Sequence, residues 1–409
     1  MSGRLLAGAL VCASALAQNL AIRGGTIYTM AGAPVTDGVV VITNGKIAAV
    51  GAAASVQVPA GYQVLTAKIV TPGLVDAHTT VGLSGYLNAP TDQDQLETSA
   101  PMQPELRAVD AYDSRERLIE WVRSFGVTTM NTGHAPGALV SGQLMVVKTR
   151  GNTVEEATVK PVSMVAASLG DQGRARGEGK SPGTRAKEIA MLREQFLKAQ
   201  DYQKKLDKAA AEKDKDKPAK APDRDLRLEV FTRILKGELP LLVTANRERD
   251  IMNALRLAHE FHFHLILDGA AEADLVMDQI QAAGVPVIVH ATMQRQLGEE
   301  ENASFETAAH LQAAGIPWAL QSGFEGYVPK TRVILFEAAA AAANGLTFDQ
   351  ALASITIDAA RLIGVADRAG SLESGKDGDA ALYDGDPFEY TTHCVGTVID
   401  GKVEFQGRQ

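Results

Sequence analysis

The central part of the chain alternates short apolar runs with amphipathic helical segments. Apolar runs of strand length lie at residues 126–130, 265–267, 285–289 and 316–320. Helical patterns lie at residues 118–123, 250–259, 274–283 and 306–314. Parallel strands need such long connections, whereas antiparallel strands do not. The pattern therefore predicts an α/β fold, and over residues 71–364 a (β/α)8 barrel of the TIM type.

The two ends of the chain have a different texture. Residues 18–70 contain short β runs separated by turns, and Asn44 and Gly45 lie between two alternating apolar runs. This pair favours a two-residue hairpin. Residues 365–409 repeat the texture, with Asp400 and Gly401 between their last two runs. Neither flank is large enough to be stable alone, so we predict that both join in one composite β-sandwich beside the barrel.

A charged segment interrupts the alternation at about residues 200–225. It is rich in Lys and Ala, with acids between the lysines and no apolar stripe. This composition predicts a solvated helix that passes into a flexible insertion. A basic partner-binding site is the alternative, and the alternating charges disfavour it.

The first 17 residues are typical of a secretory signal. They combine Arg4, an apolar stretch and a small-residue end at residues 15–17. We therefore expect an exported protein, periplasmic or secreted. Cleavage would remove Cys12 and leave Cys394, so no internal disulfide is expected. No other apolar run is long enough for a membrane span.

Size and charge limit the partners. With 409 residues, 45% of them hydrophobic, the chain can bury a large core. Its net charge of -9 argues against a nucleic-acid partner. A small-molecule ligand or substrate is expected, and a homo-oligomer is left open.

The candidate chemistry begins at the end of the first barrel strand. Residues 71–80 read TPGLVDAHTT, so a Pro-Gly turn leads into an apolar run that ends in Asp76 and His78. Polar groups at the C-terminal ends of barrel strands are where such barrels place their active sites. His78 is therefore a candidate metal ligand, and Asp76 a candidate supporting group.

This run resembles the strand-one signature of the amidohydrolase superfamily, whose members carry two metal-binding histidines there. Residues 370–388, GSLESGKDGDAALYDGDPF, resemble the family's exit from the barrel. Residues 141–151, SGQLMVVKTRG, and 240–251, PLLVTANRERDI, resemble an imidazolonepropionase-like subgroup. The resemblance implies a barrel with a flanking sandwich and hydrolysis of a carbon–nitrogen bond other than a peptide bond.

The family's metal positions are altered in this chain. By the resemblance, the second histidine of strand one falls on Thr80 and the histidine of strand five on Thr244. The histidine of strand six falls on Gly269, and the aspartate of strand eight on Ser322. Hydroxyls are poor ligands for divalent cations, and glycine has no side chain. We therefore predict a degenerate site without the binuclear centre, holding no metal or one weakly bound divalent ion of the zinc type near His78.

Three other side chains are candidate ligands beside His78. They are His134, Lys148 in a carboxylated form, and His290, each with an ordinary structural role as its alternative. The histidines at 259, 262 and 264 precede a strand, at the opposite end of the barrel from its site, so they are not candidates. Candidate ligand-binding groups lie at strand ends and on the acid-rich loop after strand one: Asp76, Asp92, Asp94, Glu97, Arg107, Thr244 and Ser322.

Two functions remain open from the sequence. The first is an amidohydrolase-type hydrolase with a rearranged or single-metal site. The second is a catalytically inactive barrel that serves as an exported ligand-binding or scaffold protein. Metal analysis of the purified protein separates the two.

Overall fold

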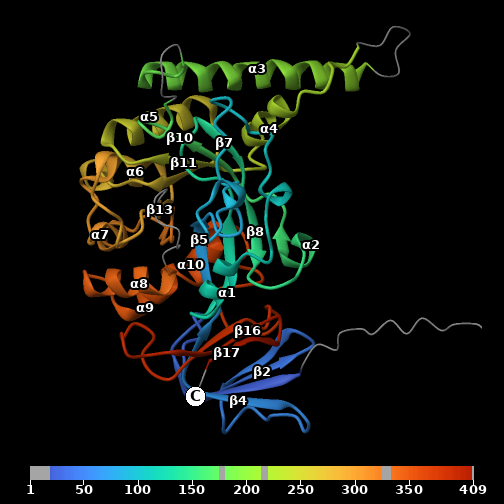
Figure 1. The fold of residues 1–409 in the computed structure, drawn as a ribbon, viewed down its shortest axis with the longest axis vertical. Coiled ribbons are helices and arrows are strands. Elements are labelled where there is room, and N and C mark those ends of the chain that lie inside the picture. The colour runs from blue at the N-terminus through green and yellow to red at the C-terminus, as the bar shows by residue number, and fades with distance from the viewer. Residues whose placement is uncertain (1–18, 175–179, 213–219, 325–332, 408–409) are drawn as a thin grey trace, which may run out of the picture.

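The computed structural model describes residues 19–174, 180–212, 220–324 and 333–407. A flanking β-sheet lies at one end of the molecule, a layer of barrel strands and helices follows, and a long helix crosses the other end (Figure 1). The predicted signal at residues 1–17 lies outside the described residues. Among the helices described, none is long and apolar enough to cross a membrane.

Both chain ends contribute to the flanking sheet, which has seven strands. The strands are β1 (Leu20–Ile27), β2 (Val35–Thr43), β3 (Lys46–Ala52), β4 (Gln63–Pro72), β15 (Ala380–Tyr383), β16 (Cys394–Ile399) and β17 (Lys402–Gln406), in the spatial order β17-β16-β15-β4-β1-β2-β3. Strand β15 pairs antiparallel with β4, so the two flanks meet in the middle of the sheet. The β2–β3 hairpin turns at Asn44 and Gly45, whose φ angles are 53° and 79°. Positive φ at both positions is what this tight turn requires.

The barrel strands form two sheets. One has β5 (Leu74–Thr79), β6 (Val127–Thr132), β8 (Met145–Lys148) and β9 (Thr158–Lys160). The other has β7 (Val140–Gln143), β10 (Val165–Ser168), β11 (Leu241–Ala245), β12 (Leu265–Gly269), β13 (Val287–Val289) and β14 (Trp318–Ala319). Strands β10 to β14 are parallel, as are β5 and β6. The segment after β14 returns to β5, where the Gly323 amide donates to the His78 carbonyl at 3.2 Å.

One part of the barrel differs from the predicted all-parallel arrangement. Strands β7 and β8 run antiparallel to β10 and β6. No helix lies between β6 and β7, and a short connection can only reverse the chain direction. The apolar runs alone do not report the direction of a strand, so this reversal was not predicted.

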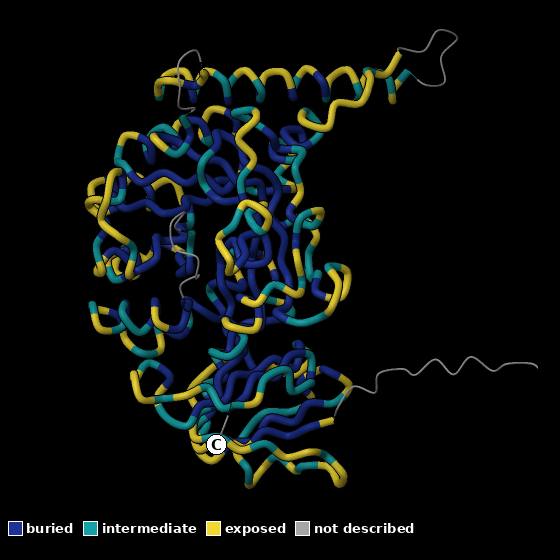
Figure 2. Tube along the Cα trace, in the orientation of Figure 1, coloured by how far each residue is buried: buried dark blue, intermediate teal, exposed yellow. Residues whose placement is uncertain are grey.

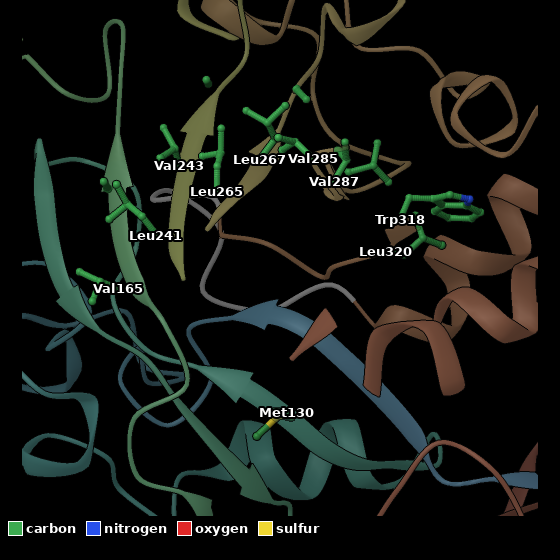
Figure 3. Packing of buried hydrophobic residues seen from close by; sticks show 14 of the residues in the cluster. Met130, Val165, Leu241, Val243, Leu265, Leu267, Val285, Val287, Trp318 and Leu320 are labelled. Carbon is green, nitrogen blue, oxygen red and sulfur yellow. The ribbon is translucent and has the colours of Figure 1, made fainter. Parts of the chain in front are cut away.

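Helices cover the outside of the strands. They are α1 (Arg117–Arg123), α2 (Val154–Ala157), α4 (Leu226–Leu235), α5 (Glu248–Phe261), α6 (Met277–Ala283), α7 (Thr307–Ala313), α8 (Ile334–Ala343), α9 (Phe348–Ser354) and α10 (Ile357–Leu362). The four predicted helical segments coincide with α1, α5, α6 and α7. Side chains from successive strands, Leu241, Val243, Leu265, Leu267 and Val287 among them, pack in one buried cluster (Figure 3). The strands are accordingly the most buried part of the trace (Figure 2).

The helix α3 (Arg185–Ala211) crosses the end of the molecule far from the flanking sheet (Figure 1). Its Phe196 ring lies 5.2, 4.9 and 5.0 Å from those of Phe231, Phe261 and Phe263. Tyr202 is buried as well, so the first part of the segment predicted as an insertion packs on the core. Residues 213–219 of that segment lie outside the described residues.

Candidate functional site

A buried histidine–aspartate pair lies at the C-terminal ends of the barrel strands. His78, near the end of β5, places Nδ1 3.0 Å from Oδ1 of Asp268 on β12. Both side chains are almost fully buried. The two residues are 190 positions apart in the chain, so the barrel fold brings them together. The pair joins a titratable ring to the charged group that orients it.

Hydrogen bonding around Asp268 determines which nitrogen of His78 carries the proton. The Thr244 hydroxyl donates to Asp268 Oδ2 at 2.6 Å, and Gln321 Nε2 donates to Oδ1 at 2.7 Å. These donors and His78 lower the pKa of Asp268 although burial opposes this, so the carboxylate is ionised and only accepts. His78 Nδ1 must therefore be the donor, which leaves a lone pair on Nε2 in the neutral ring.

The free nitrogen of His78 has the properties of a general base. Nε2 is buried and has no hydrogen-bond partner at normal bonding distance in the described part of the chain, although the His134 backbone acts on the ring and helps to raise the pKa of His78. Burial disfavours the charged ring, but the charges of Asp268 and Asp76 and the bond to Asp268 outweigh it and raise the pKa of His78 above 6.5. A raised pKa makes the neutral ring a stronger proton acceptor.

The pair borders a cavity of about 370 Å³. His78, Asp268 and Thr244 form its floor, and Asn246, Arg295 and Glu300 are among its polar lining groups. Leu297 and Phe324 add apolar surface. This volume suits a small organic molecule.

The four altered metal positions are all occupied by other interactions. Thr80 hydrogen-bonds Ser84 at 2.5 Å, Thr244 donates to Asp268, and the Ser322 hydroxyl lies 3.0 Å from Thr79 Oγ1. At Gly269 an added Cβ would lie 2.4 Å from Asn246 Oδ1, so the Asn246 side chain fills the space of the family's histidine. Asn246 is held there by its bond to Glu300 at 2.9 Å.

The donor set around His78 does not fit the family's metal centre. Zinc sites need at least three protein ligands, each from a nitrogen, sulfur or carboxylate oxygen. Within the described ranges, no group of three or more His, Cys, Asp or Glu side chains could hold a metal ion. Of the two carboxylates near His78, Asp268 already bonds three groups and Asp76 accepts two backbone amides, so both are engaged within the protein.

Asp76 and Ser322 hold the site together. Asp76 Oδ1 accepts the backbone amides of His78 at 3.3 Å and Ser322 at 3.1 Å, which joins β5 to the segment after β14. Burial raises the pKa of Asp76 to about 6, although these bonds oppose the rise. These two residues, predicted as ligand contacts, therefore lie behind the cavity wall rather than on it; Thr244 does line the cavity.

Lys148 and His290 are not brought to His78. Lys148 pairs with Asp377 at 3.0 Å, with Asp379 and, at 3.9 Å, with Asp400. Thr129, its partner on β6, lies opposite Val75 near the start of β5, so Lys148 is at the other end of the strand from His78. A carbamate there would face three carboxylates. His290 is buried, with Nδ1 2.9 Å from the Ala291 carbonyl and Nε2 3.3 Å from Thr307 Oγ1.

His134 lies under the loop that follows β5. Its ring is buried against Gly142, where an added Cβ would be 2.5 Å from Nε2, so only glycine allows this approach. Neither ring nitrogen has a hydrogen-bond partner among the residues described, and His134 does not line the cavity of His78. Burial lowers the pKa of His134 to about 4.

The buried His134 ring predicts acid sensitivity. The unfolded chain protonates this ring near pH 6.5, whereas the folded protein resists protonation down to about pH 4. Between these values falling pH favours the unfolded state, by up to about 3 kcal/mol. Burial raises the pKa of Asp76 to about 6 and that of Glu188 to about 7, which acts in the opposite direction. The contribution of His134 is therefore the difference in slope between the wild type and His134→Leu in urea unfolding at a series of pH values. An equal difference produced by His259→Leu, at an exposed position, would contradict this assignment.

The acid-rich loop after β5 is held by its own contacts. Asp92 accepts the amides of Leu87 at 2.9 Å and Ala89 at 2.8 Å, and Glu97 accepts the Ser99 amide at 2.7 Å. Arg107 pairs with Asp110 at 2.6 Å on the surface. Asp94, like these three, is not part of the lining of His78's cavity. Asp92, Glu97 and Arg107 therefore stabilise the loop, which was the alternative role for this set.

Sequence reasoning missed Asp268, Gln321 and Asn246 as site residues. Asp268 ends an apolar run at the C-terminal end of a strand, which is the same signal that identified His78. The resemblance to the family places its histidine on the next residue, Gly269, and Asp268 was therefore not predicted. Asn246 and Gln321 follow strands on loops, where no spacing pattern marks them.

A barrel with a flanking sheet and a polar cavity at the strand ends is the arrangement of a TIM-barrel protein with its site at the C-terminal ends of the strands. The chain belongs to the amidohydrolase family, because the model of the Amidohydrolase family matches residues 82–405. The predicted superfamily is thereby confirmed. The family's barrel and flanking domain agree with the mixed α/β architecture described above.

Two curated relatives illustrate the match. The chain is 24% identical over 369 residues to amidohydrolase tasK of Hapsidospora irregularis, which covers 82% of this chain and 36% of that protein. It is 43% identical over 75 residues to imidazolonepropionase of Caulobacter sp. (strain K31), covering 18% of this chain and 19% of that protein. The chain therefore spans only about a third and a fifth of these relatives' lengths.

Solved structures support the fold. An amidohydrolase from Thermotoga maritima MSB8 superposes with a TM-score of 0.88 at 27% identity, covering 95% of this chain and all (100%) of that one. Molinate hydrolase superposes with a TM-score of 0.58 at 16% identity, covering 95% and 94%. The second likeness shows the fold alone.

Proposed function

We propose that this protein hydrolyses a carbon–nitrogen bond, other than a main-chain peptide bond, in a small molecule. The observation that carries the proposal is the buried His78–Asp268 pair, both of whose residues line a cavity at the strand ends of an amidohydrolase-family barrel. The family membership supplies the reaction class. The pair supplies a base suited to it.

The proposed reaction uses His78 twice. Nε2 takes a proton from water as the water oxygen attacks the carbonyl carbon, and Asp268 stabilises the imidazolium that forms. Arg295 and Asn246 carry N–H donors on the lining for the negative charge on the carbonyl oxygen. When the carbon–nitrogen bond breaks, the proton on His78 passes to the leaving nitrogen. Water is consumed, and an acid and an amine are the products.

This mechanism does not need the family's binuclear centre. The described residues that line the cavity include one histidine, His78. At most one divalent ion would therefore be held there, and weakly. We expect well below one zinc ion per chain after dialysis against a chelator, with activity retained. Elemental analysis and an activity assay on the same sample test this. Two zinc ions that survive dialysis, or activity that vanishes with the metal, would overturn it.

A screen of small amides, cyclic amides and imides for amine or acid release tests the function itself. Turnover that exceeds the His78→Gln protein supports hydrolysis. Ligands that bind without turnover would instead favour the ligand-binding alternative. We also propose export of the protein, on the pattern of its first 17 residues.

A further inference from the structure

A second cavity of about 530 Å³ adjoins the cavity of His78. Pro136 and Gln172 line both, so the two cavities are neighbours at these residues. Much of the wall comes from the loops that follow β5, β6 and β10. Because these loops all leave the C-terminal ends of their strands, both cavities are on the catalytic face of the barrel.

The wall of the second cavity is mixed and has a continuous share of apolar residues. Leu96, Ala100, Pro101, Pro136 and Ala138 contribute to it. At Gly137, whose φ is 146°, an added Cβ would lie 2.3 Å from Leu96 Cδ2. This close approach requires glycine and packs the two loops directly against each other. The cavity is therefore a partly open hollow between packed loops.

The charged groups at its edge largely neutralise one another. Arg174 lies 3.2 Å from Asp171 and 3.6 Å from the buried Glu188. Lys180 is exposed at the rim. Selection in this cavity therefore depends on apolar area and shape more than on a charge in the ligand.

We propose that the substrate is an elongated amide whose apolar substituent occupies this second cavity while its carbon–nitrogen bond lies at His78. The inference rests on the proposed function for the reaction and on the neighbouring cavities for the substituent. A compact substrate would fill only the first cavity and leave the apolar wall in contact with water, so each added methylene group should strengthen binding.

Chain-length dependence tests this. The probes are acetamide, butanamide, hexanamide and octanamide, bound to the His78→Gln protein and followed by calorimetry. We expect affinity to rise about fourfold per methylene group. Ala100→Phe and Thr98→Phe, two changes on the cavity wall, should each abolish the rise. Ala343→Phe, an exposed position at the end of α8, is the matched control and should preserve it.

The same series as 4-nitroanilides measures turnover by the wild-type protein. Longer acyl groups should raise kcat/KM in the wild type and in Ala343→Phe, and Ala100→Phe should remove the gain. Affinity that is independent of length, or a length dependence that both wall variants keep, would overturn the inference. Length-dependent binding without hydrolysis of any anilide would uphold the cavity assignment and count against the proposed function alone.

Discussion

His78→Gln is expected to lower kcat/KM by about three orders of magnitude, within the range found when a general base is removed. Glutamine can keep a donor near Asp268 and fills a similar volume, but it cannot accept a proton from water. The wild-type kcat/KM should rise with pH as His78 loses its proton, with its midpoint above pH 6.5 because the pKa of His78 is raised. That inflection should be missing from the residual activity of the variant.

His290→Gln is the matched control. His290 is equally buried, yet it bonds the Ala291 carbonyl and Thr307 and does not line the cavity. Its loss should affect stability rather than the pH profile. Full activity in His78→Gln, or an unchanged inflection, would assign the base to another residue.

Asp268→Asn supplies an independent check on the pair. An amide in place of the carboxylate no longer stabilises the imidazolium and can turn its NH₂ toward Nδ1, which moves the ring proton to Nε2. Residues that act as a unit are not additive, so the double variant should be little worse than His78→Gln alone. Independent losses that multiply would show that the two residues do not act together.

The fold could be anticipated from the sequence because its signals are local. Apolar runs, amphipathic helices and the Asn44–Gly45 turn each follow from neighbouring residues, and the elements lie close to where they were expected. The direction of β7 and β8 could not be anticipated, because it depends on the connection between β6 and β7, which contains no helix. The apolar face of α3 was not predicted, because a Lys-rich run dominates the composition of that segment. The partners of Phe196 on this face come from α4, α5 and the residues after α5.

The site was only half predictable. His78 and Thr244 were found because each ends a strand in a motif with a known position. The His78–Asp268 bond joins residues 190 positions apart, and no spacing rule reports such a contact. His134, Lys148 and His290 were predicted as metal ligands because their sequence positions place them near the expected metal positions of the family. The structure instead assigns these three to packing or to partners outside the cavity.

The positions where the resemblance places metal ligands carry other contacts in this chain. Asn246 occupies the space over Gly269, and Thr244 and Gln321 bond the carboxylate that holds His78. Gly269→His would therefore place its Cβ 2.4 Å from Asn246 Oδ1 in the present arrangement. Of the altered positions, Thr244 contributes directly to the polar network around Asp268. The network in turn fixes the tautomer on which the proposed chemistry depends.

Lys148→Met is expected to destabilise the protein by about 3–5 kcal/mol, the cost of removing one partner from a buried ion pair. Lys148 joins β8 to the C-terminal flank through Asp377 and Asp379, and all three side chains are nearly inaccessible to water. The carboxylates together raise the pKa of Lys148, although burial opposes this. Without the ammonium group, Asp379 has no cation to balance its charge in the contacts described. Urea unfolding at neutral pH measures the loss.

Two controls separate this buried charge from ordinary loss of a lysine. Arg193→Ala breaks the exposed pair with Glu260, whose nitrogen–oxygen distance is 2.7 Å, and should cost no more than about 1 kcal/mol. The double variant Lys148→Met with Asp379→Asn removes the stranded charge as well and should recover part of the stability. A Lys148→Met protein as stable as the wild type would mean that the three aspartates do not depend on the lysine. The junction between barrel and flanking sheet would then rest on its other contacts, among them the Arg150–Asp400 pair at 2.5 Å and the bond from the Tyr383 hydroxyl to the Phe125 carbonyl at 3.0 Å.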